Sequence, residues 1–330
     1  MPSQAHLVRL ISTCLSFGSP SAKPLLPNGG IVRLGERGET FVREVPGPPD
    51  SIPVVLLHGW AMTADLNYID VYAPLSAAHR VVAPDVRMHG RGPRGGGFTL
   101  TDAADDVIAL LDTLDIDRAI LCGFSMGGGI AADVVERYPD RVAGTVIAGT
   151  AACYTTRLRD RMIFAGLNAL RPLVAIGINP PPGLLMAMLA RGTSALGAQR
   201  ARWLFREYSR TTLSDVLSVS EHMPAFDLRP RLAHGVERPC EFLVLARDHV
   251  CHPQLQRELA ELLGAHVTTL DADHDLPITH PERYAESLVA AVGRLDRRLN
   301  SGQLIPARGA TDEASGTGGR RSRAHDEAAG

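Results

Sequence analysis

The sequence Ala-Ile-Leu-Cys-Gly-Phe-Ser-Met-Gly-Gly, at residues 119–128, decides how this chain is expected to fold. Its first four residues form a short apolar run, which predicts a buried strand. Residues 123–127 then match the pattern G-x-S-x-G, in which Gly123 and Gly127 leave room for a very tight turn. Apolar residues recur at helical spacing after this turn. The stretch therefore predicts a strand and a helix joined by a turn that carries Ser125.

Short apolar runs of the same kind recur along the chain, and segments with helical periodicity separate most of them. The runs are Ile31–Leu34, Thr40–Val45, Pro53–Leu57, Arg80–Pro84, Ala119–Cys122, Val142–Ala148, Glu241–Leu245 and His266–Leu270. The first two flank a glycine-containing tetrapeptide, which predicts a hairpin. Continuous apolar strands that alternate with helices are typical of a parallel sheet covered on both faces. We therefore expect an α/β fold with a mostly parallel, doubly wound sheet.

The strand signal is interrupted between Ala151 and about residue 236. We interpret residues 151–236 as a helical cap inserted into an α/β core, which comprises residues 31–150 and 237–299. Residues 1–30, rich in Pro, Gly and Ser toward their end, are expected to be a leader and linker. Residues 300–330 contain too few apolar side chains to offset the entropy of ordering, so we expect a disordered tail.

The composition is that of an ordinary globular protein. The 330 residues have a formal net charge of −2, with 45% hydrophobic and 21% charged residues, so no surface for nucleic acid is expected. The five cysteines include no C-x-x-C pair, which argues against a disulfide framework and fits a reducing, cytoplasmic location. No apolar run is long enough for a membrane-spanning helix. The apolar cap segment 162–190 could still make a weak contact with a membrane surface. The sequence predicts no particular oligomeric state.

The hydroxyl of Ser125 is a poor nucleophile unless a base removes its proton. His274 is the candidate base, because it follows the last predicted strand and would reach the carboxyl edge of the sheet, where open α/β sheets place their sites. His252, in a proline-bounded loop, and His280, at the start of a predicted helix, are the alternatives. Asp248 follows the preceding strand and is the candidate acid that orients the imidazole, its alternative role being to close a loop as an Asx turn.

Two backbone N–H groups are expected to face the hydroxyl of Ser125. Met126 follows the serine at the start of a helix, where free N–H groups favour negative charge. Trp60 follows His58-Gly59 after a predicted strand, and the loop that begins there can direct its N–H to the same point. Donors placed where negative charge develops are commonly worth a few kcal/mol each, so we predict an oxyanion hole formed by Trp60 and Met126.

These residues resemble the α/β-hydrolase superfamily, and the similarity extends from about residue 31 to residue 299. It comprises His58-Gly59-Trp60, the turn sequence at 85–92, the G-x-S-x-G turn, and the order Ser125, Asp248, His274 along the chain. The resemblance implies the α/β-hydrolase fold with a cap over the site, and an enzyme that needs neither cofactor nor metal. A serine at the nucleophile position disfavours the branches of the superfamily that use an aspartate there.

Two residues depart from the pattern of the superfamily. Met88 replaces a usual glycine in the turn at 85–92, and we interpret this as a tolerated loop change. Asp273 replaces the glycine often found before the histidine. A second carboxylate beside His274 is expected to raise the pKa of that histidine or to shift its loop.

The predicted function is a serine hydrolase that cleaves a carboxylic ester through an acyl-enzyme on Ser125. The apolar cap would suit a lipophilic acyl ester, and a thioester or lactone would serve the same chemistry; ordinary packing of the cap is the other explanation of its apolar residues. The resemblance leaves open a carbon–carbon bond hydrolase, an acyltransferase or a cofactor-free haloperoxidase-like enzyme. A non-catalytic ligand receptor on the same fold is a further alternative.

Overall fold

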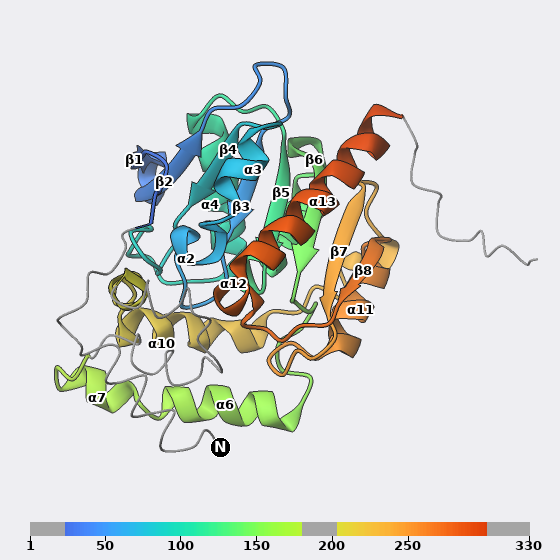
Figure 1. Cartoon of the computed structure of the whole chain (residues 1–330). Helices are drawn as coiled ribbons and strands as arrows, with labels where there is room; N and C mark the ends of the chain where they lie inside the picture. The colour runs from blue at the N-terminus through green and yellow to red at the C-terminus, as the bar shows by residue number, and fades with distance from the viewer. Residues whose placement is uncertain (1–23, 180–202, 302–330) are drawn as a thin grey trace, which may run out of the picture.

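The computed structural model describes residues 24–179 and 203–301, and this part of the chain contains one eight-stranded sheet. The strands are β1 (Gly29–Arg33), β2 (Glu39–Val45), β3 (Val54–Leu57), β4 (Val81–Pro84), β5 (Ala119–Phe124), β6 (Val142–Ala148), β7 (Cys240–Leu245) and β8 (His266–Leu270). They lie in the order β1-β2-β4-β3-β5-β6-β7-β8 (Figure 1). The β1–β2 hairpin adds to β4 in antiparallel orientation, and β4, β3, β5, β6, β7 and β8 are parallel. The predicted mostly parallel sheet is confirmed.

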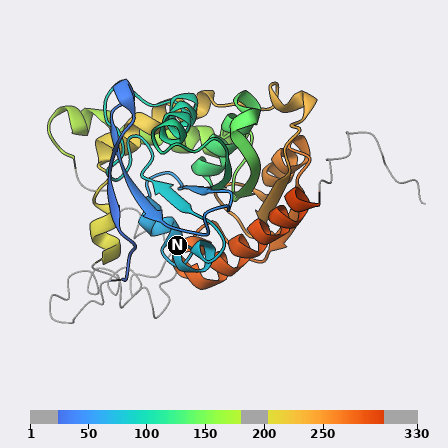
Figure 2. The same ribbon diagram turned by 90° about the horizontal axis from the view of Figure 1, so that it is seen from above.

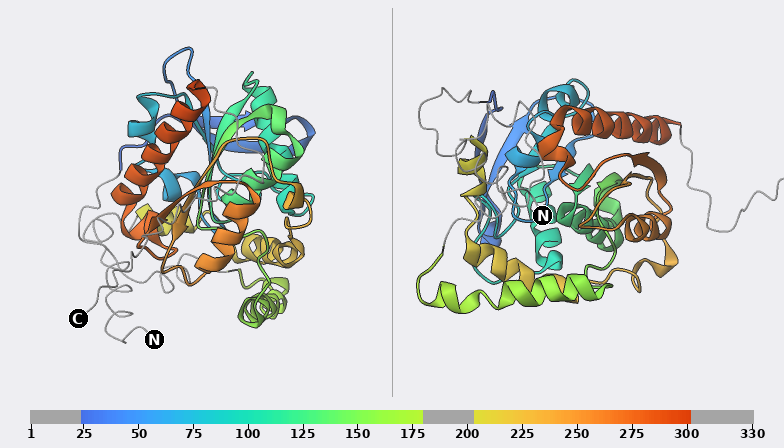
Figure 3. Two further views of the ribbon diagram at one scale, coloured as in Figure 1. Left: turned by 90° about the vertical axis from the view of Figure 1, so that its right-hand side faces the viewer. Right: turned by 60° about the horizontal axis from the view of Figure 1, so that its bottom comes forward.

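Helices cover both faces of this sheet (Figure 3). One face carries α2 (Ala64–Tyr68), α3 (Tyr72–Ser76), α12 (Leu276–Thr279) and α13 (Pro281–Asn300), and the other carries α4 (Leu100–Thr113), α5 (Met126–Arg137) and α11 (Pro253–Leu262). From above, the β1–β2 hairpin and β8 lie at opposite edges of the sheet (Figure 2). The sheet is therefore doubly wound, as its continuous apolar strands predict.

The core is divided by the sheet into two clusters of buried side chains. Val54 and Leu56 of β3 pack with side chains of α2, α3 and α13, whereas Val55 and Leu57 pack with those of α4 and α5. All four are completely buried. Successive side chains of a strand point to opposite faces, so both sets must be apolar here. Full burial of each contributes about 1.5–3 kcal/mol, and this holds the carboxyl ends of the strands in fixed positions.

Of the helices between β6 and β7 in the sequence, three α-helices that the structure describes in full lie beyond the carboxyl ends of the parallel strands (Figure 1). They are α6 (Leu158–Asn168), α7 (Arg171–Ala175) and α10 (Leu213–His222). Arg94 of the core pairs with Asp215 of α10 at 3.2 Å, and the Gly90 N–H donates to Thr211 at 3.0 Å. The predicted division into core and cap stays an interpretation of this layout.

Large apolar side chains are exposed on α6 and directly after α7, among them Leu158, Met162 and Ile176. The predicted contact of this segment with a membrane surface stays a prediction. No helix within residues 24–179 and 203–301 is both long and apolar enough to cross a membrane. Most of the expected leader, all but the first two residues of the expected tail and part of the expected cap lie outside the described residues.

Candidate active site

The turn between β5 and α5 holds Ser125 in a strained conformation at the end of the strand. Ser125 has φ 52° and ψ −122°, a region that residues other than glycine rarely occupy. A Cβ atom on Gly127 would overlap the Leu57 carbonyl, and one on Gly123 would overlap the Gly127 carbonyl. Both glycines are therefore needed for the close passage of helix against strand, as the G-x-S-x-G pattern predicts.

The structure brings Ser125, His274 and Asp248 into one hydrogen-bonded chain. Nε2 of His274 lies 2.9 Å from the Ser125 hydroxyl, and Nδ1 lies 2.8 Å from Oδ2 of Asp248. The three side chains come from the ends of β5, β7 and β8, at the shared carboxyl edge of the sheet. A carboxylate can only accept, so Nδ1 carries the proton and Nε2 can accept the proton of the hydroxyl. Ser125 is 9% exposed and Asp248 is 2% exposed.

Four donors surround the carboxylate of Asp248. Oδ1 accepts the N–H groups of Val250 and Cys251, both at 2.8 Å, and Oδ2 accepts Nε2 of Gln256 at 2.9 Å in addition to His274. The predicted Asx-turn role of this aspartate is therefore present together with its contact to the imidazole. The two roles use different oxygens of the carboxylate, so they do not compete.

Gln256 is a site residue that the sequence analysis missed. It is completely buried on α11, its Oε1 accepts the Leu245 N–H at 2.9 Å, and its Nε2 also donates to the Cys251 carbonyl. The signal was present, because residues 256, 259, 260 and 263 follow helical spacing on the buried side of this segment. A glutamine on an apolar helical face needs internal hydrogen-bond partners.

Burial alone would lower the pKa of His274, but the charge of Asp248 and the hydrogen bond to it outweigh burial, and Asp273 and Asp275 act in the same direction. The pKa therefore lies above its ordinary value of 6.5, in the direction expected from the sequence. The ring of Phe124 packs against the imidazole, with 5.1 Å between the ring centroids. The carboxylates thus favour the imidazolium form, which is the form a base adopts after it has taken a proton.

The loop after β3 is held by hydrogen bonds that fix the direction of the Trp60 N–H. Nε2 of His58 accepts the Val86 N–H at 2.8 Å, so Nδ1 carries the proton and donates to the Gly59 carbonyl at 2.8 Å. Burial lowers the pKa of His58 to about 4, which keeps the ring neutral. The Gly59 carbonyl and the Trp60 N–H belong to one planar peptide group, so fixing the first fixes the second.

Asn67 of α2 is a second residue that the sequence analysis did not single out. Its side-chain carbonyl accepts the Gly59 N–H at 2.8 Å, so the glycine is held on both of its peptide groups. A Cβ atom on Gly59 would lie 3.4 Å from the Cβ of Ser125. The loop therefore runs directly beside the serine.

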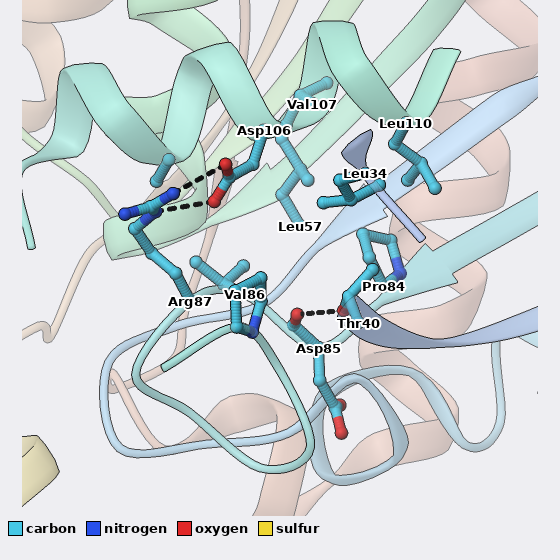
Figure 4. Close-up of a pocket in the computed structure, with 12 residues that line it drawn as sticks. Leu34, Thr40, Leu57, Pro84, Asp85, Val86, Arg87, Asp106, Val107 and Leu110 are labelled. Carbon is cyan, nitrogen blue, oxygen red and sulfur yellow. Dashed lines mark hydrogen bonds and ion pairs between the residues drawn. The ribbon is translucent and has the colours of Figure 1, made fainter. Parts of the chain in front are cut away.

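The loop after β4, which supports His58 through Val86, is itself anchored on both sides (Figure 4). Arg87 forms a bidentate ion pair with Asp106 of α4, with distances of 2.5 and 2.7 Å, and Thr40 donates to the Asp85 carbonyl at 2.6 Å. A small cavity of about 20 Å³ lies between these contacts, away from the three residues of the hydrogen-bonded chain. The loop is thus part of the rigid support of the site.

Met88, which departs from the family pattern in this loop, has φ 61°. That is the left-handed region that a glycine occupies without strain. Met88 therefore adopts a backbone conformation that suits glycine, and this conformation is strained for a methionine. The predicted tolerance of this change stays a prediction.

The alternative histidines lie at helix ends and do not contact Ser125 or Asp248. Nδ1 of His252 accepts the Gln254 N–H at the start of α11, and His280 is the residue before α13, with Nδ1 3.0 Å from the Thr279 hydroxyl. Within the described residues no group of three or more His, Cys, Asp or Glu side chains could hold a metal ion. His274 is therefore the histidine that the fold places at the serine.

Comparison with known proteins assigns the chain to a family. The model of the α/β-hydrolase fold matches residues 52–281, and the chain belongs to this family. It is 33% identical over 176 residues to a non-heme chloroperoxidase of Streptomyces lividans, covering 53% of this chain and 56% of that one. It is 40% identical over 105 residues to a pimeloyl-[acyl-carrier protein] methyl ester esterase of Aromatoleum aromaticum, covering 32% and 39%. The chain thus spans at most about half the length of these relatives.

Among solved structures, an enol-lactonase from Burkholderia xenovorans superposes with a TM-score of 0.65 and 25% identity, covering 77% of this chain and 97% of that one. Relatives with several different names therefore share this fold. The family match gives the α/β-hydrolase fold, and the choice among reactions depends on the site.

Proposed function

We propose that the protein is a serine hydrolase that cleaves carboxylic esters through an acyl-enzyme on Ser125. The observation that carries the proposal is the hydrogen-bonded chain from Ser125 through His274 to Asp248, with distances of 2.9 and 2.8 Å. These distances suit a nucleophile, its general base and the acid that orients the base. Membership of the family and a relative named as a methyl ester esterase support the same class of reaction.

In the first half of the reaction, Nε2 of His274 takes the hydroxyl proton while Oγ of Ser125 attacks the ester carbonyl. The imidazolium then gives this proton to the leaving alcohol, and an acyl-enzyme is left. In the second half His274 takes a proton from water while the water oxygen attacks the acyl group, and the imidazolium then returns this proton to Oγ as the serine is released. Asp248 keeps Nδ1 protonated throughout and stabilises the imidazolium.

The oxyanion that forms in both halves needs preorganised donors. We assign this role to the backbone N–H groups of Trp60 and Met126. Met126 is the first residue of α5, where N–H groups have no partner within the helix. The hydrogen bond from Nδ1 of His58 to the Gly59 carbonyl orients the peptide group that contains the Trp60 N–H, so this donor is in place before substrate binds.

The proposed substrate carries an apolar group next to the ester. The ring of Trp60 lies 6.1 Å from that of Phe164 on α6, and Met62 is nearly buried beside Gly59. These apolar side chains border the segment that runs past Ser125. A lipophilic acyl or alcohol group would gain burial against them, whereas a charged group would lose hydration.

The proposal is tested with a fluorophosphonate probe and a series of p-nitrophenyl esters of rising acyl length. The wild-type protein is expected to be labelled and to hydrolyse the esters, and Ser125→Ala is expected to lose both properties while keeping its thermal unfolding transition. Ser287→Ala, on α13, serves as the matched control and should behave as wild type. Labelling that persists in Ser125→Ala, or inactivity of wild type on every ester, would contradict the proposal.

The acyl acceptor is a separate question, which the chloroperoxidase relative raises. Hydrogen peroxide could replace water in the second half of the reaction and release a peracid, with the same proton transfers through His274. The acyl acceptor can be identified by turning over an ester in the presence of hydrogen peroxide or an added alcohol. Analysis of the products then shows whether an acid, a peracid or a new ester has formed. Carboxylic acid as the sole product would leave hydrolysis as the function.

A further inference from the structure

Asp273, the residue immediately before the candidate base, joins the loop of Asp248 to the loop of His274. Backbone hydrogen bonds between the two segments continue beyond the ends of β7 and β8. The Ala246 N–H donates to the Leu270 carbonyl at 2.8 Å, and the Arg247 N–H donates to the Ala272 carbonyl at 2.9 Å. The next bond in this series uses a side chain in place of a backbone carbonyl.

Oδ1 of Asp273 accepts two backbone N–H groups, one from each loop. The His249 N–H donates to it at 3.1 Å and the His274 N–H at 2.8 Å. His249 follows Asp248 directly in the chain, so a single oxygen atom binds the backbone of the base and the backbone of the residue after the acid. Oδ2 lies 3.7 Å from Nε2 of His249.

We propose that Asp273 is a positioning residue, whose carboxylate ties the loop of the acid Asp248 to the loop of the base His274. The inference rests on the proposed function, because it concerns the alignment of the same three residues. Small displacements of a base relative to its nucleophile are costly in rate, so a bond that holds both loops contributes to kcat without touching substrate.

The negative charge of Asp273 has a second consequence. The titratable groups that face the imidazole are the carboxylates of Asp248, Asp273 and Asp275 and the hydroxyl of Ser125, and the ring of Phe124 packs beside it. The charge of Asp273 favours the imidazolium form of His274. Removing that charge should therefore lower the pKa of the histidine and move the acidic limb of the pH–rate profile to lower pH.

Two variants separate the bond from the charge. Asp273→Asn keeps an acceptor oxygen and removes the charge, so kcat on the alkaline plateau should stay near that of wild type while the acidic limb moves to lower pH. Asp273→Ala removes both, and its kcat is expected to fall about tenfold with an unchanged KM. Asp271→Asn is the control, since that carboxylate is exposed in the same loop and pairs with Arg247.

A titration of the His274 ring by NMR measures the charge effect without turnover, and it can be repeated in the Ser125→Ala background. A lower pKa in both Asp273 variants, but not in Asp271→Asn, is expected. Unchanged kcat in Asp273→Ala together with an unchanged ring titration would overturn the proposal. Loss of the proposed function has a different signature, because the wild-type protein would then turn over no ester while the ring titration still responded to Asp273.

Discussion

At the scale of single residues, the carboxylate of Asp248 is the most constrained group of the site. Its Oδ1 accepts two backbone N–H groups, and its Oδ2 is shared between His274 and Gln256. Hydrogen bonds to a charged acceptor are stronger than neutral ones, and here they leave the carboxylate one orientation. The protonation of the imidazole at Nδ1 follows from that orientation, so the basicity of Nε2 toward Ser125 depends on it.

Asp248→Asn is expected to slow ester turnover by roughly 10³–10⁴-fold with a folded protein. The amide oxygen would stay with the two backbone N–H groups, which leaves an NH₂ group facing His274. The imidazole would then carry its proton on Nε2 and could not accept that of Ser125. Steady-state kinetics and thermal unfolding measure the two effects, and turnover equal to wild type would show that the orienting acid lies elsewhere.

Gln256→Met keeps the volume of the side chain but removes both the donor to Asp248 and the acceptor for the Leu245 N–H. An unsatisfied buried group costs about 1–3 kcal/mol, so the free energy of unfolding should fall by that amount. Turnover should fall as well, because Asp248 loses one of the bonds that fix it. Urea unfolding and kcat are the measurements, and a variant with wild-type values of both would make Gln256 an ordinary packing residue.

The sequence predicted Ser125, Asp248 and His274 because each follows a recognisable strand. Gln256 and Asn67 were not predicted, because their contacts are made between elements. The oxygen of Asn67 meets Gly59 only after α2 has packed against the loop that follows β3. Hydrophobic periodicity in a sequence predicts which face of a helix or strand a residue lies on. It does not predict which other element will pack against that face.

At the scale of elements, the turn from β5 to α5 depends on close backbone approach more than on side-chain packing. The strained φ of Ser125 costs on the order of 1–3 kcal/mol, which the buried strand and helix on either side must offset. The completely buried residues of β5 and the apolar face of α5 supply that support. The serine thus owes its position to the two elements that flank it.

Gly127→Ala tests this dependence. The added Cβ would overlap the Leu57 carbonyl of β3, so we expect loss of activity and a free energy of unfolding lower by several kcal/mol. Gly166→Ala is the control, because nothing lies within 4 Å of its Cβ position on α6. That change should raise stability by about 0.5–1 kcal/mol. Equal behaviour of the two variants in thermal unfolding would contradict this account of the turn.

Strand positions were predictable where parallel strands are buried, continuous apolar runs, and β6, which is buried throughout, has the predicted bounds. β8 also has the predicted bounds, although its side chains are exposed or half-buried. β5 extends two residues beyond its apolar run, since Gly123 and Phe124 still pair with Ile147 and Ala148. Hydrophobicity cannot show this, because pairing there depends on the neighbouring strand. The apolar content of α6 likewise suggested packing, yet Phe164 is its one buried residue.

At the scale of the whole molecule, two neutral histidines make stability depend on pH. His58 and His89 are completely buried, and burial lowers their pKa values to about 4 and about 3, from an ordinary 6.5. Below pH 6.5 the unfolded chain takes up protons that the folded protein does not. The stability these groups contribute is therefore lost as pH falls from about 6.5 toward their folded pKa values.

From these shifts we expect each of the two histidines to reduce the free energy of unfolding by about 2 kcal/mol between pH 7 and pH 5. His79 and His274 act in the opposite direction, since their pKa values are raised. Urea unfolding at the two pH values measures the net change, and His89→Gln should reduce the loss by about 2 kcal/mol. An identical loss in that variant would rule out His89 as a source of the effect.

The hydrogen-bonded chain at the site joins residues that are far apart in the sequence, since His274 lies 149 positions after Ser125. During synthesis on the ribosome, the strand–turn–helix unit with the serine is therefore complete long before the imidazole has been translated. The growing polypeptide carries an inert hydroxyl until β7, β8 and their loops have joined the sheet. Chemical competence thus arises at the last stage of assembly, and a prematurely terminated translation product would be unable to attack esters in the cell.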